Sequence, residues 1–386
     1  MRVAYFPDSF HEVNGVAHTS RQFQAFAQRR GLPFLCVRAG DRTPRLLIED
    51  HLWTLELPRG PLSFGLERDL RFDVAFFRFI PLITRTLHRF QPDLIHITGP
   101  SDNGLIGAAL AHHLRLPLVA SWHTNLHQYA ATRARWLIRR LPPSMRPRVA
   151  RFIQDSSLDL MAWFYSLARV LFAPNPGLCT LLEQHAYRPC HLMQRGVDTN
   201  LFTPVRRTRT HEDTTIILGY AGRLSVEKNV ALLAQVHQQL TGHGFTNFRF
   251  LILGHGAEET WLRNHLPNAD FPGVLRGPSL ATAYANMDAF VFPSHTDTFG
   301  NAVLEALASG VPAIVTPTGG PASIVCDGCT GFIRADSAFA DAVLRLASDP
   351  ALHNRMRAAA RIRALRTSWD SVFESVYTHY GAALNE

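Results

Sequence analysis

Two carboxylates, a glycine and the start of a helix come together in residues 293–310, whose sequence is PSHTDTFGNAVLEALASG. Apolar residues recur at helical spacing in its second half, which predicts a helix with Glu305 about two turns in. Asp297 lies on the expected loop before it. Unpaired amides and the helix dipole make such a terminus a phosphate site. We expect these amides at Phe299, Gly300, Asn301 and Ala302. A phosphate-binding helix terminus beside two carboxylates is a plausible binding site for a nucleotide-sugar.

One lysine, Lys228, stands among the 39 basic residues of the chain, and all the others are arginine. It lies in the segment GRLSVEKN, residues 222–229, five positions after Arg223. Lysine is a compact point charge, whereas arginine presents a planar fork of donors. A site that needs one of each side by side would explain why a single lysine is kept.

The chain has 386 residues, of which 46% are hydrophobic and 18% charged, as expected for a globular protein of two domains. No apolar run approaches the roughly 20 residues of a membrane-spanning helix, and the apolar start is too short for a signal peptide. An odd number of cysteines argues against a disulfide framework, and Cys326 and Cys329 lack a second pair for zinc. We expect a cytoplasmic enzyme without metal or cofactor.

Short apolar runs alternate with helical patterns along both halves of the chain. This alternation predicts parallel sheets covered by helices on both faces, which is the α/β class with two doubly wound domains. Strands are expected at residues 3–6, 34–37, 94–97, 118–121, 170–173, 216–220, 250–253, 289–292 and 313–315. Helices are expected at residues 16–29, 103–114 and 177–185, among others.

The domain boundary is expected within residues 194–213, which contain glycine, proline and a run of arginines without a clear period. The predicted parts are domains 1–195 and 196–367, followed by a helical segment, 368–386, that could pack on either domain or cross back to the first. Ligands of open parallel sheets bind at the carboxyl ends of the strands. Facing sheets would therefore place the active site in a cleft between the domains.

Five segments, in order along nearly the whole chain, resemble the retaining glycosyltransferases of family 4. They are residues 7–16 (PDSFHEVNGV), 121–124 (SWHT), 196–204 (GVDTNLFTP), 222–228 (GRLSVEK) and 297–305 (DTFGNAVLE). The resemblance implies the GT-B fold of two facing Rossmann-like domains, the first binding the acceptor and the second the nucleotide-sugar. The family pattern has two glutamates eight positions apart in the last segment, whereas this chain has Asp297 in place of the first.

The resemblance also implies roles for residues of the second domain. Arg223 and Lys228 would bind the donor diphosphate in place of a metal, because two cations can offset the charge of the leaving group. Glu305 would accept hydrogen bonds from both ribose hydroxyls, and Asp297 from hydroxyls of the donor sugar. The amides of residues 299–302 would hold phosphate or sugar oxygens.

The resemblance also implies roles for two residues of the first domain. His123 would lie near the 6-position of the donor sugar, and Gly15 would let the backbone approach the diphosphate. A buried histidine with only a packing role and an ordinary turn glycine remain the alternatives. No carboxylate of the first domain stands out as a general base. In this family's mechanism a phosphate oxygen of the donor can take the acceptor's proton.

Charge is unevenly divided, since residues 1–195 carry a net charge of +10 and residues 196–386 a net charge of −2. Arginines also alternate with aromatic and aliphatic residues at 132–141 and at 72–80. This pattern suits an anionic membrane surface at the inner face, or arginine stems that cover an ordinary apolar face. The expected partners are a nucleotide-sugar donor, a lipid or glycan acceptor and this membrane surface, with no nucleic acid.

The leading hypothesis is a metal-independent retaining hexosyltransferase that makes an α-glycosidic bond. Residues 14–16 with 297–300 look most like those of α-mannosyltransferases that use GDP-mannose with lipid acceptors. UDP-glucose or another UDP-sugar is the alternative donor. A GT-B-like nucleotide-sugar epimerase would need acid and base carboxylates beside the anomeric carbon, which the sequence does not identify. A binding protein without catalysis has no reason to keep Arg223, Lys228 and Glu305.

Overall fold

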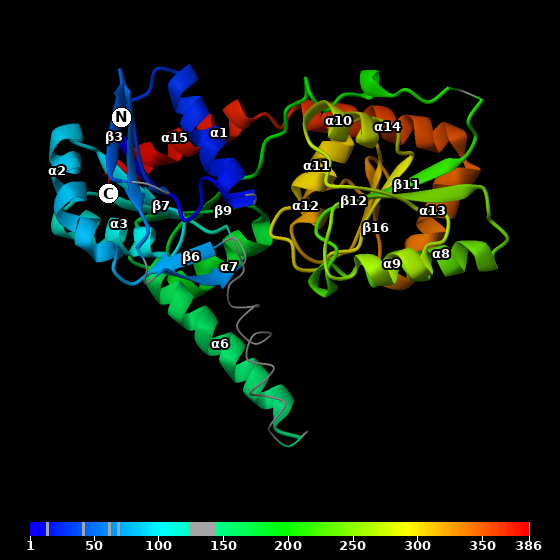
Figure 1. Ribbon diagram of the computed structural model, residues 1–386, viewed down its shortest axis with the longest axis horizontal. Coiled ribbons are helices and arrows are strands. Elements are labelled where there is room, and N and C mark those ends of the chain that lie inside the picture. The colour runs from blue at the N-terminus through cyan, green and yellow to red at the C-terminus, as the bar shows by residue number, and fades with distance from the viewer. Residues whose placement is uncertain are drawn as a thin grey trace. The chain divides into compact units, whose positions relative to one another are not determined.

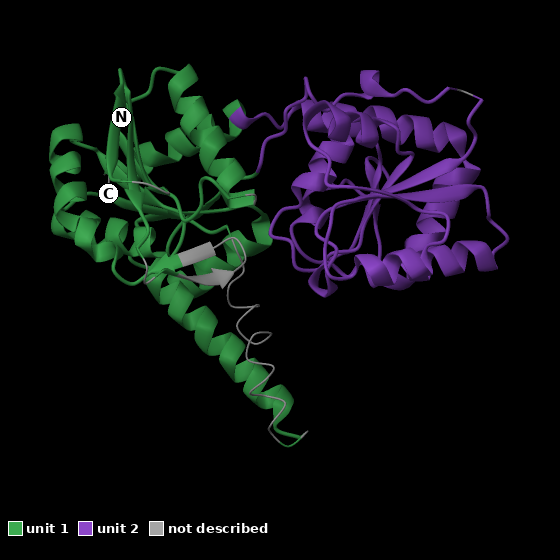
Figure 2. Ribbon diagram, in the orientation of Figure 1, with its two compact units in different colours: residues 1–194, 370–386 green, residues 195–369 purple. Residues whose placement is uncertain are grey.

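The computed structural model describes residues 1–12, 15–40, 43–60, 63–67, 70–123, 142, 144–210 and 212–385. Figure 2 shows that the chain forms two compact units. Unit 1 consists of Met1–Gln194 and Asp370–Glu386, and unit 2 of Arg195–Trp369. Each unit is built on a largely parallel sheet with its own hydrophobic core, which confirms the predicted fold class.

Unit 1 contains, within its described residues, an eight-stranded sheet of order β10-β9-β8-β7-β1-β2-β4-β3. Neighbouring strands are parallel except β3, which runs antiparallel to β4. The strands are β1 Val3–Phe6, β2 Phe34–Gly40, β3 Arg45–Glu49, β4 Leu52–Pro58, β7 Leu94–Ile97, β8 Leu118–Ser121, β9 Val170–Ala173 and β10 Cys190–Leu192. A separate antiparallel hairpin joins β5 Ser63–Glu67 to β6 Leu70–Asp73.

The described helices of unit 1 are α1 Gly15–Arg29, α2 Ile80–Phe90, α3 Asp102–His113, α6 Arg146–Tyr165, α7 Pro176–Ala186 and α15 Trp369–Asn385, with a 3-10 turn at Phe76–Phe79. Figure 1 shows α6 projecting away from the sheet, and its buried residues all lie near its C-terminal end. The last of these helices, α15, packs against α1, so the end of the chain contacts its beginning. Phe373 of α15 stacks on Phe23 of α1 with the ring centres 4.4 Å apart, and Asp370 forms an ion pair with Arg29 at 2.5 Å.

Unit 2 contains, in the part of it that is described, a six-stranded parallel sheet of order β13-β12-β11-β14-β15-β16. The chain proceeds from β11 outward to one edge and then from β14 outward to the other, so the strand order reverses between β11 and β14. The strands are β11 Ile216–Ala221, β12 Phe248–Leu253, β13 Asp270–Gly273, β14 Ala289–Phe292, β15 Ala313–Val315 and β16 Gly331–Ile333.

Helices pack on both faces of the unit 2 sheet; Figure 1 shows α8 and α9 on one side and α10, α11 and α14 on the other. They are α8 Ala231–Gly242, α9 Glu259–His265, α10 Gly277–Ala285, α11 Asn301–Ala308, α12 Pro321–Ile324, α13 Phe339–Ser348 and α14 Pro350–Leu365. The described part of unit 2 also has 3-10 turns at Pro204–Arg206, Val226–Lys228 and Asp336–Ala338.

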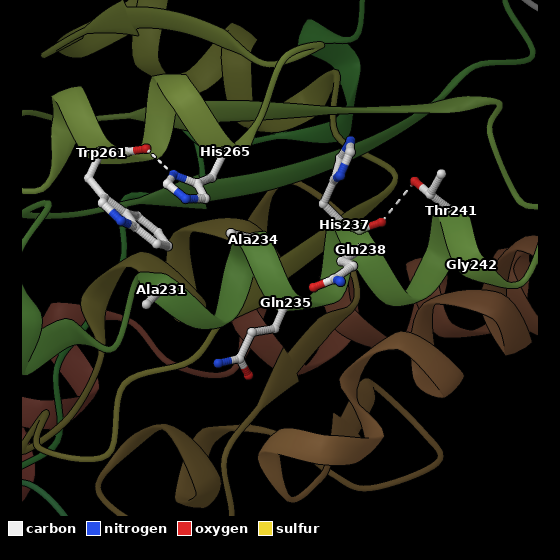
Figure 3. A pocket seen from close by; sticks show the side chains of 9 residues that line it. All are labelled: Ala231, Ala234, Gln235, His237, Gln238, Thr241, Gly242, Trp261 and His265. Carbon is white, nitrogen blue, oxygen red and sulfur yellow. Dashed lines mark hydrogen bonds between the residues drawn. The ribbon is translucent and has the colours of Figure 1, made fainter.

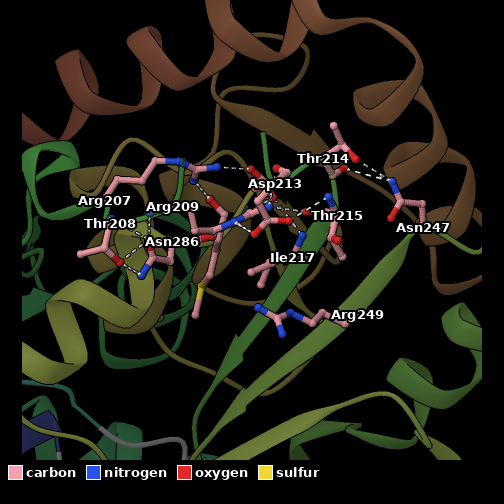
Figure 4. Close-up of polar contacts among 12 residues, drawn as sticks. Arg207, Thr208, Arg209, Asp213, Thr214, Thr215, Ile217, Asn247, Arg249 and Asn286 are labelled. Carbon is pink, nitrogen blue, oxygen red and sulfur yellow. Dashed lines mark hydrogen bonds and ion pairs between the residues drawn. The ribbon is translucent and has the colours of Figure 1, made fainter. Parts of the chain in front are cut away.

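A buried ion network closes the amino end of the unit 2 sheet (Figure 4). Asp288, directly before β14, accepts hydrogen bonds from Arg207 at 2.8 Å, from Arg209 at 2.5 Å and from the backbone amide of Ile217 at 2.9 Å. Arg209 also bonds to Asp213 at 2.8 Å. The arginine run that marked the domain boundary in the sequence therefore anchors the connecting segment to the sheet.

Candidate active site

The loops after β11 and β14 form the centre of the candidate site in unit 2. These strands are adjacent and parallel, so both loops leave the sheet at the point where the strand order reverses, which is the usual ligand position in such folds. Lys228 comes from the first loop and Asp297 from the second. Their Nζ and Oδ1 atoms lie 2.5 Å apart, with about a fifth of each side chain exposed. The other oxygen of Asp297, Oδ2, is buried without a hydrogen-bond partner among the described residues.

Arg223 belongs to the same loop as Lys228 but has a different partner. Its side chain is 49% exposed and lies 3.9 Å from the carboxylate of Glu227, four positions further along the same loop. Its carbonyl accepts a hydrogen bond from the buried Tyr220 hydroxyl at 2.9 Å, which ties this part of the loop to β11. Of these two cations, Lys228 is thus the more buried and Arg223 the more exposed.

The helix after Asp297 begins later than the sequence predicts. Gly300 is its N-cap, with a left-handed backbone (φ 102°), and Asn301 is the first residue of α11. The amides of Asn301 and Ala302 precede the first backbone hydrogen bond at this end, which Val303 donates to the Gly300 carbonyl at 3.0 Å. The prediction that Phe299 and Gly300 lie in the first turn is wrong, since both precede the helix and Phe299 is buried.

Glu305 lies one turn into α11 rather than two, which brings it closer to the N-terminal amides than predicted. Burial of its carboxyl group raises its pKa to about 7, and a hydrogen bond with the Tyr284 hydroxyl opposes that rise. Tyr284, on α10, is itself buried. A carboxylate held in an environment that penalises its charge is typical of functional sites.

A glycine pair after β15 supports the Asp297 loop, and the sequence analysis missed it. The Gly320 amide donates to the Asp297 carbonyl at 2.7 Å. A Cβ on Gly320 would lie 2.2 Å from the Thr298 carbonyl oxygen, so only glycine fits this contact. His295 further ties the loops together, through Thr318 at 2.8 Å and Asp336 at 3.0 Å. The available signal was Gly-Gly-Pro, which begins four residues after the predicted strand 313–315.

The carboxyl edge of the unit 1 sheet carries the two predicted residues of that unit. Gly15 is the first residue of α1, and His123 follows β8 by two positions. Only 6% of His123 is exposed, and its Nε2 lies 2.7 Å from the Ser121 hydroxyl. Thr124 and the arginine-rich stretch 132–141 lie outside the described residues.

Asp8 is a carboxylate of unit 1 that the sequence analysis passed over. It lies two positions after the end of β1, and burial raises its pKa to about 6. Hydrogen bonds from Ser101 and Thr98 oppose that rise, and the charge of Asp102 adds to it. Its Oδ1 atom is buried and has no hydrogen-bond partner in the described part of the chain. The signal was an acidic residue at the end of a continuous apolar strand.

Neither a metal cluster nor a membrane-spanning helix is found in the described residues. No group of three or more His, Cys, Asp or Glu side chains is placed there to hold an ion. No helix among them has the length and apolarity needed to cross a bilayer. Cys326 and Cys329 are exposed free thiols on a turn.

Helix α6 presents an exposed apolar stripe that was not predicted. Five residues on or next to α6, each at least 49% exposed, recur on one side at helical spacing: Met145, Phe152, Leu160, Trp163 and Leu167. In the predicted stretch 72–80, by contrast, Phe76 is buried and Arg78 bonds to the buried Asp73 at 2.9 Å, so Arg78 is held by the fold.

A hollow of about 630 Å³ lies between α8 and α9, lined partly by Trp261, His265 and His237 (Figure 3). The Trp261 ring stacks on His265 with the ring centres 3.9 Å apart. None of the predicted site residues lines this hollow.

Comparison with known proteins assigns the class. Residues 13–201 match the family model described as Glycosyltransferase Family 4, and residues 203–363 match Glycosyl transferases group 1. The chain belongs to the family-4 glycosyltransferases and has their GT-B fold, as its five motifs predicted.

Two relatives that align over nearly the whole chain have the same description. A GDP-mannose-dependent alpha-mannosyltransferase of Mycobacterium tuberculosis is 31% identical over 99% of this chain and 97% of the relative. One of the same description from Mycolicibacterium smegmatis is 30% identical over 100% and 98%. Among solved structures, a sucrose-phosphate synthase of Thermosynechococcus elongatus superposes with a TM-score of 0.72, at 19% identity and with 99% and 100% of the chains covered.

Proposed function

We propose that this glycosyltransferase transfers a mannosyl group from GDP-mannose to a hydroxyl of a lipid or saccharide, with retention of the α-configuration and without a metal. Unit 2 would bind the donor and unit 1 the acceptor. The observation that carries the proposal is the Lys228–Asp297 contact where the strand order of unit 2 reverses. The choice of donor is supported by full-length relatives described as GDP-mannose-dependent alpha-mannosyltransferases.

The diphosphate would be held by Lys228, Arg223 and the amides of Asn301 and Ala302. Because Lys228 already lies against a carboxylate, it is pre-positioned, and a phosphate oxygen can share its three N–H donors with Asp297. In the transfer step the bond from the anomeric carbon to the phosphate oxygen breaks. The new bond to the acceptor oxygen forms on the same face, and the acceptor's proton passes to the departing phosphate. The cations offset the charge of that leaving group.

The remaining residues would bind the rest of the donor. Glu305 accepts the ribose hydroxyls, which requires its ionised form. Asp297 accepts a sugar hydroxyl through Oδ2, the atom that has no partner among the described residues. Phe299 and Gly300 shape the approach to the helix amides. In unit 1, His123 contacts the sugar near its 6-position and Gly15 lies at the diphosphate.

Ligand-dependent stability tests the donor. GDP, UDP and ADP are each added to the protein, and the shift of the melting temperature is measured. A ligand at 100 times its dissociation constant adds about 2.7 kcal/mol to the free energy of unfolding. We expect GDP to give the largest shift. A larger shift with UDP would indicate that the donor is a UDP-sugar and not GDP-mannose.

Transfer itself is tested with GDP-mannose and octyl α-mannoside, a probe with a saccharide hydroxyl and a lipid-like tail. The anomeric one-bond carbon–proton coupling of the product reports its configuration, which we expect to be α. The rate should be the same with and without EDTA. A β-linked product would exclude retention, and a loss of rate with EDTA would exclude the metal-free reaction.

The exposed stripe of α6 supports an anionic membrane surface as a further partner. Apolar side chains on one side, with Arg148 and Arg151 exposed nearby, suit a helix that lies on an acidic bilayer. Binding is measured by co-sedimentation with phosphatidylglycerol or phosphatidylcholine vesicles. We expect binding to the former only, and loss of it with Phe152→Ser and Trp163→Ser together.

A further inference from the structure

Four buried side chains of unit 1 form one continuous hydrogen-bonded chain. The Tyr380 hydroxyl, on α15, bonds to Nδ1 of His96, on β7. The Nε2 atom of His96 lies 2.9 Å from the hydroxyl of Ser121, at the end of β8, and that hydroxyl lies 2.7 Å from Nε2 of His123. None of the four residues is more than 6% exposed. The last helix of the chain is thereby connected to a residue of the candidate site.

Only one direction of donation along this chain satisfies the buried Tyr380 hydroxyl. Within the described residues the Tyr380 hydroxyl has His96 as its only hydrogen-bond partner, and a buried O–H without an acceptor is costly. Tyr380 therefore donates to Nδ1 of His96. Burial lowers the pKa of His96 to about 3, so its ring is neutral and carries its one proton on Nε2. His96 then donates to Ser121, and the Ser121 hydroxyl donates to Nε2 of His123.

We propose that Tyr380, through His96 and Ser121, is a positioning residue that holds His123 as the neutral tautomer with its proton on Nδ1. A histidine that accepts at Nε2 has to carry its proton on the other nitrogen. The orientation of the ring and the donor atom it presents are then both fixed. The consequence for transfer rests on the proposed function, in which His123 contacts the donor sugar.

The tautomer is measured directly by imidazole ¹⁵N NMR on the full-length protein, with the His123 signals assigned by their loss in His123→Gln. In the wild type we expect the Nδ1–H tautomer alone. In Tyr380→Phe, Nδ1 of His96 loses its partner, neither direction of donation is favoured, and His123 should populate both tautomers. A His123 spectrum that is unchanged by Tyr380→Phe would overturn the proposal.

A matched control lies on the same helix. The Tyr377 hydroxyl is buried and has no hydrogen-bond partner within the described residues. Tyr377→Phe should therefore leave the tautomer of His123 and the transfer rate unchanged. An equal effect of both substitutions would mean that packing of α15, and not the hydrogen-bonded chain, is responsible. Ser121→Ala removes the last link without touching α15, and it should give the same mixture of tautomers even if Tyr380→Phe fails to fold.

Activity provides the second readout. We expect Tyr380→Phe to lower kcat with GDP-mannose roughly tenfold, the scale of one lost hydrogen bond, with little change in KM. In a His123→Gln background the same substitution should have no further effect. A tenfold loss in that background as well would show that Tyr380 acts elsewhere. If His123→Gln transfers at the wild-type rate, the role of His123 in the proposed function is wrong, and the tautomer measurement still decides the hydrogen-bonded chain.

Discussion

The ammonium group of Lys228 and the carboxylate of Asp297 lie 2.5 Å apart, although the two residues are separated by 69 positions in the chain. The contact exists because β11 and β14 are neighbours in the sheet and their loops leave from the same edge. It fixes the position of the only lysine of the protein. Pre-positioned charge of this kind stabilises a transition state without reorganisation at the moment of reaction.

Replacing Lys228 by Ala should lower kcat/KM for transfer by about 10²- to 10³-fold, the usual cost of one preorganised transition-state donor. Circular dichroism should show a folded protein. The control is Arg249→Ala, which removes an exposed cation paired with Asp270 at 3.3 Å. Arg249→Ala should transfer normally. Retained activity in Lys228→Ala would show that the leaving group is stabilised by other residues.

The single ε-amine also permits a footprint without mutation. Acetic anhydride can acylate only Lys228 and the N-terminus among the amines of this chain. GDP should slow acetylation of Lys228, measured by peptide mass spectrometry, and leave the N-terminal rate unchanged. Equal rates with and without GDP would place the diphosphate away from Lys228.

Replacing Glu305 by Gln should affect binding and stability in opposite directions. The pKa of Glu305 is about 7 in the fold against an ordinary value of 4.5, because burial penalises its charge. Ionising it therefore costs stability, and the free energy of unfolding should fall as the pH rises from 4.5 through 7. Glu305→Gln removes this cost and should melt at a higher temperature than the wild type at pH 8. It should also bind GDP more weakly, since the carboxylate proposed to accept the ribose hydroxyls is lost.

The pH dependence of GDP binding checks the same point. The ionised form of Glu305 increases above its pKa, so GDP affinity should rise between pH 6 and pH 8. The phosphates of GDP make their own contribution to the pH dependence of GDP affinity. The Glu305→Gln variant lacks the carboxylate and therefore measures that contribution alone. We expect calorimetric titrations of the two proteins to diverge as the pH rises. Parallel curves would mean that Glu305 does not contact the nucleotide.

Replacing Gly320 by Ala should displace the Asp297 loop. Its backbone is in the ordinary helical region (φ −63°), so the expected effect is steric and comes from a Cβ 2.2 Å from the Thr298 carbonyl oxygen. A displacement of about 1 Å at a reacting centre can cost 10²-fold, and we expect a loss of that order in kcat/KM. Gly242→Ala is the control, since its Cβ would have no atom within 4 Å. It should leave transfer unchanged, and a harmless Gly320→Ala would mean that the loop tolerates movement.

The strands were largely predictable, because continuous apolar runs such as 170–173 and 289–292 require burial on both faces. The strands that the prediction did not include lack such a run. β3 is an edge strand with exposed Arg45 and Glu49, and β13 and β16 are edge strands of three or four residues. Their pairing depends on neighbours brought close by the fold.

The types of residue in the candidate site could be predicted from the sequence, but the contacts between them could not. Lys228 is conspicuous as the single lysine, yet its pairing with Asp297 depends on the strand order of the sheet. The depth of Glu305 in its helix depends on the left-handed Gly300, which delays the helix start to Asn301. Tyr380 could not be connected to His123 from the sequence, because two other side chains lie between them.

Replacing Asp288 by Asn should destabilise unit 2 by about 3 kcal/mol, because Arg207 and Arg209 would lose a buried carboxylate (Figure 4). Burial alone would raise the pKa of Asp288, but the Ile217 amide and the two arginines hold it below its usual value. The stabilisation is thus present above the unfolded-state pKa of about 3.9 and is lost as the pH falls through the lower folded value. Urea unfolding should separate wild type from Asp288→Asn at pH 7, and the difference should shrink as the pH falls below about 3.9. Asp270→Asn, in the exposed pair with Arg249, should cost under about 1 kcal/mol, and an equal cost for both would mean that burial does not strengthen the Asp288 network.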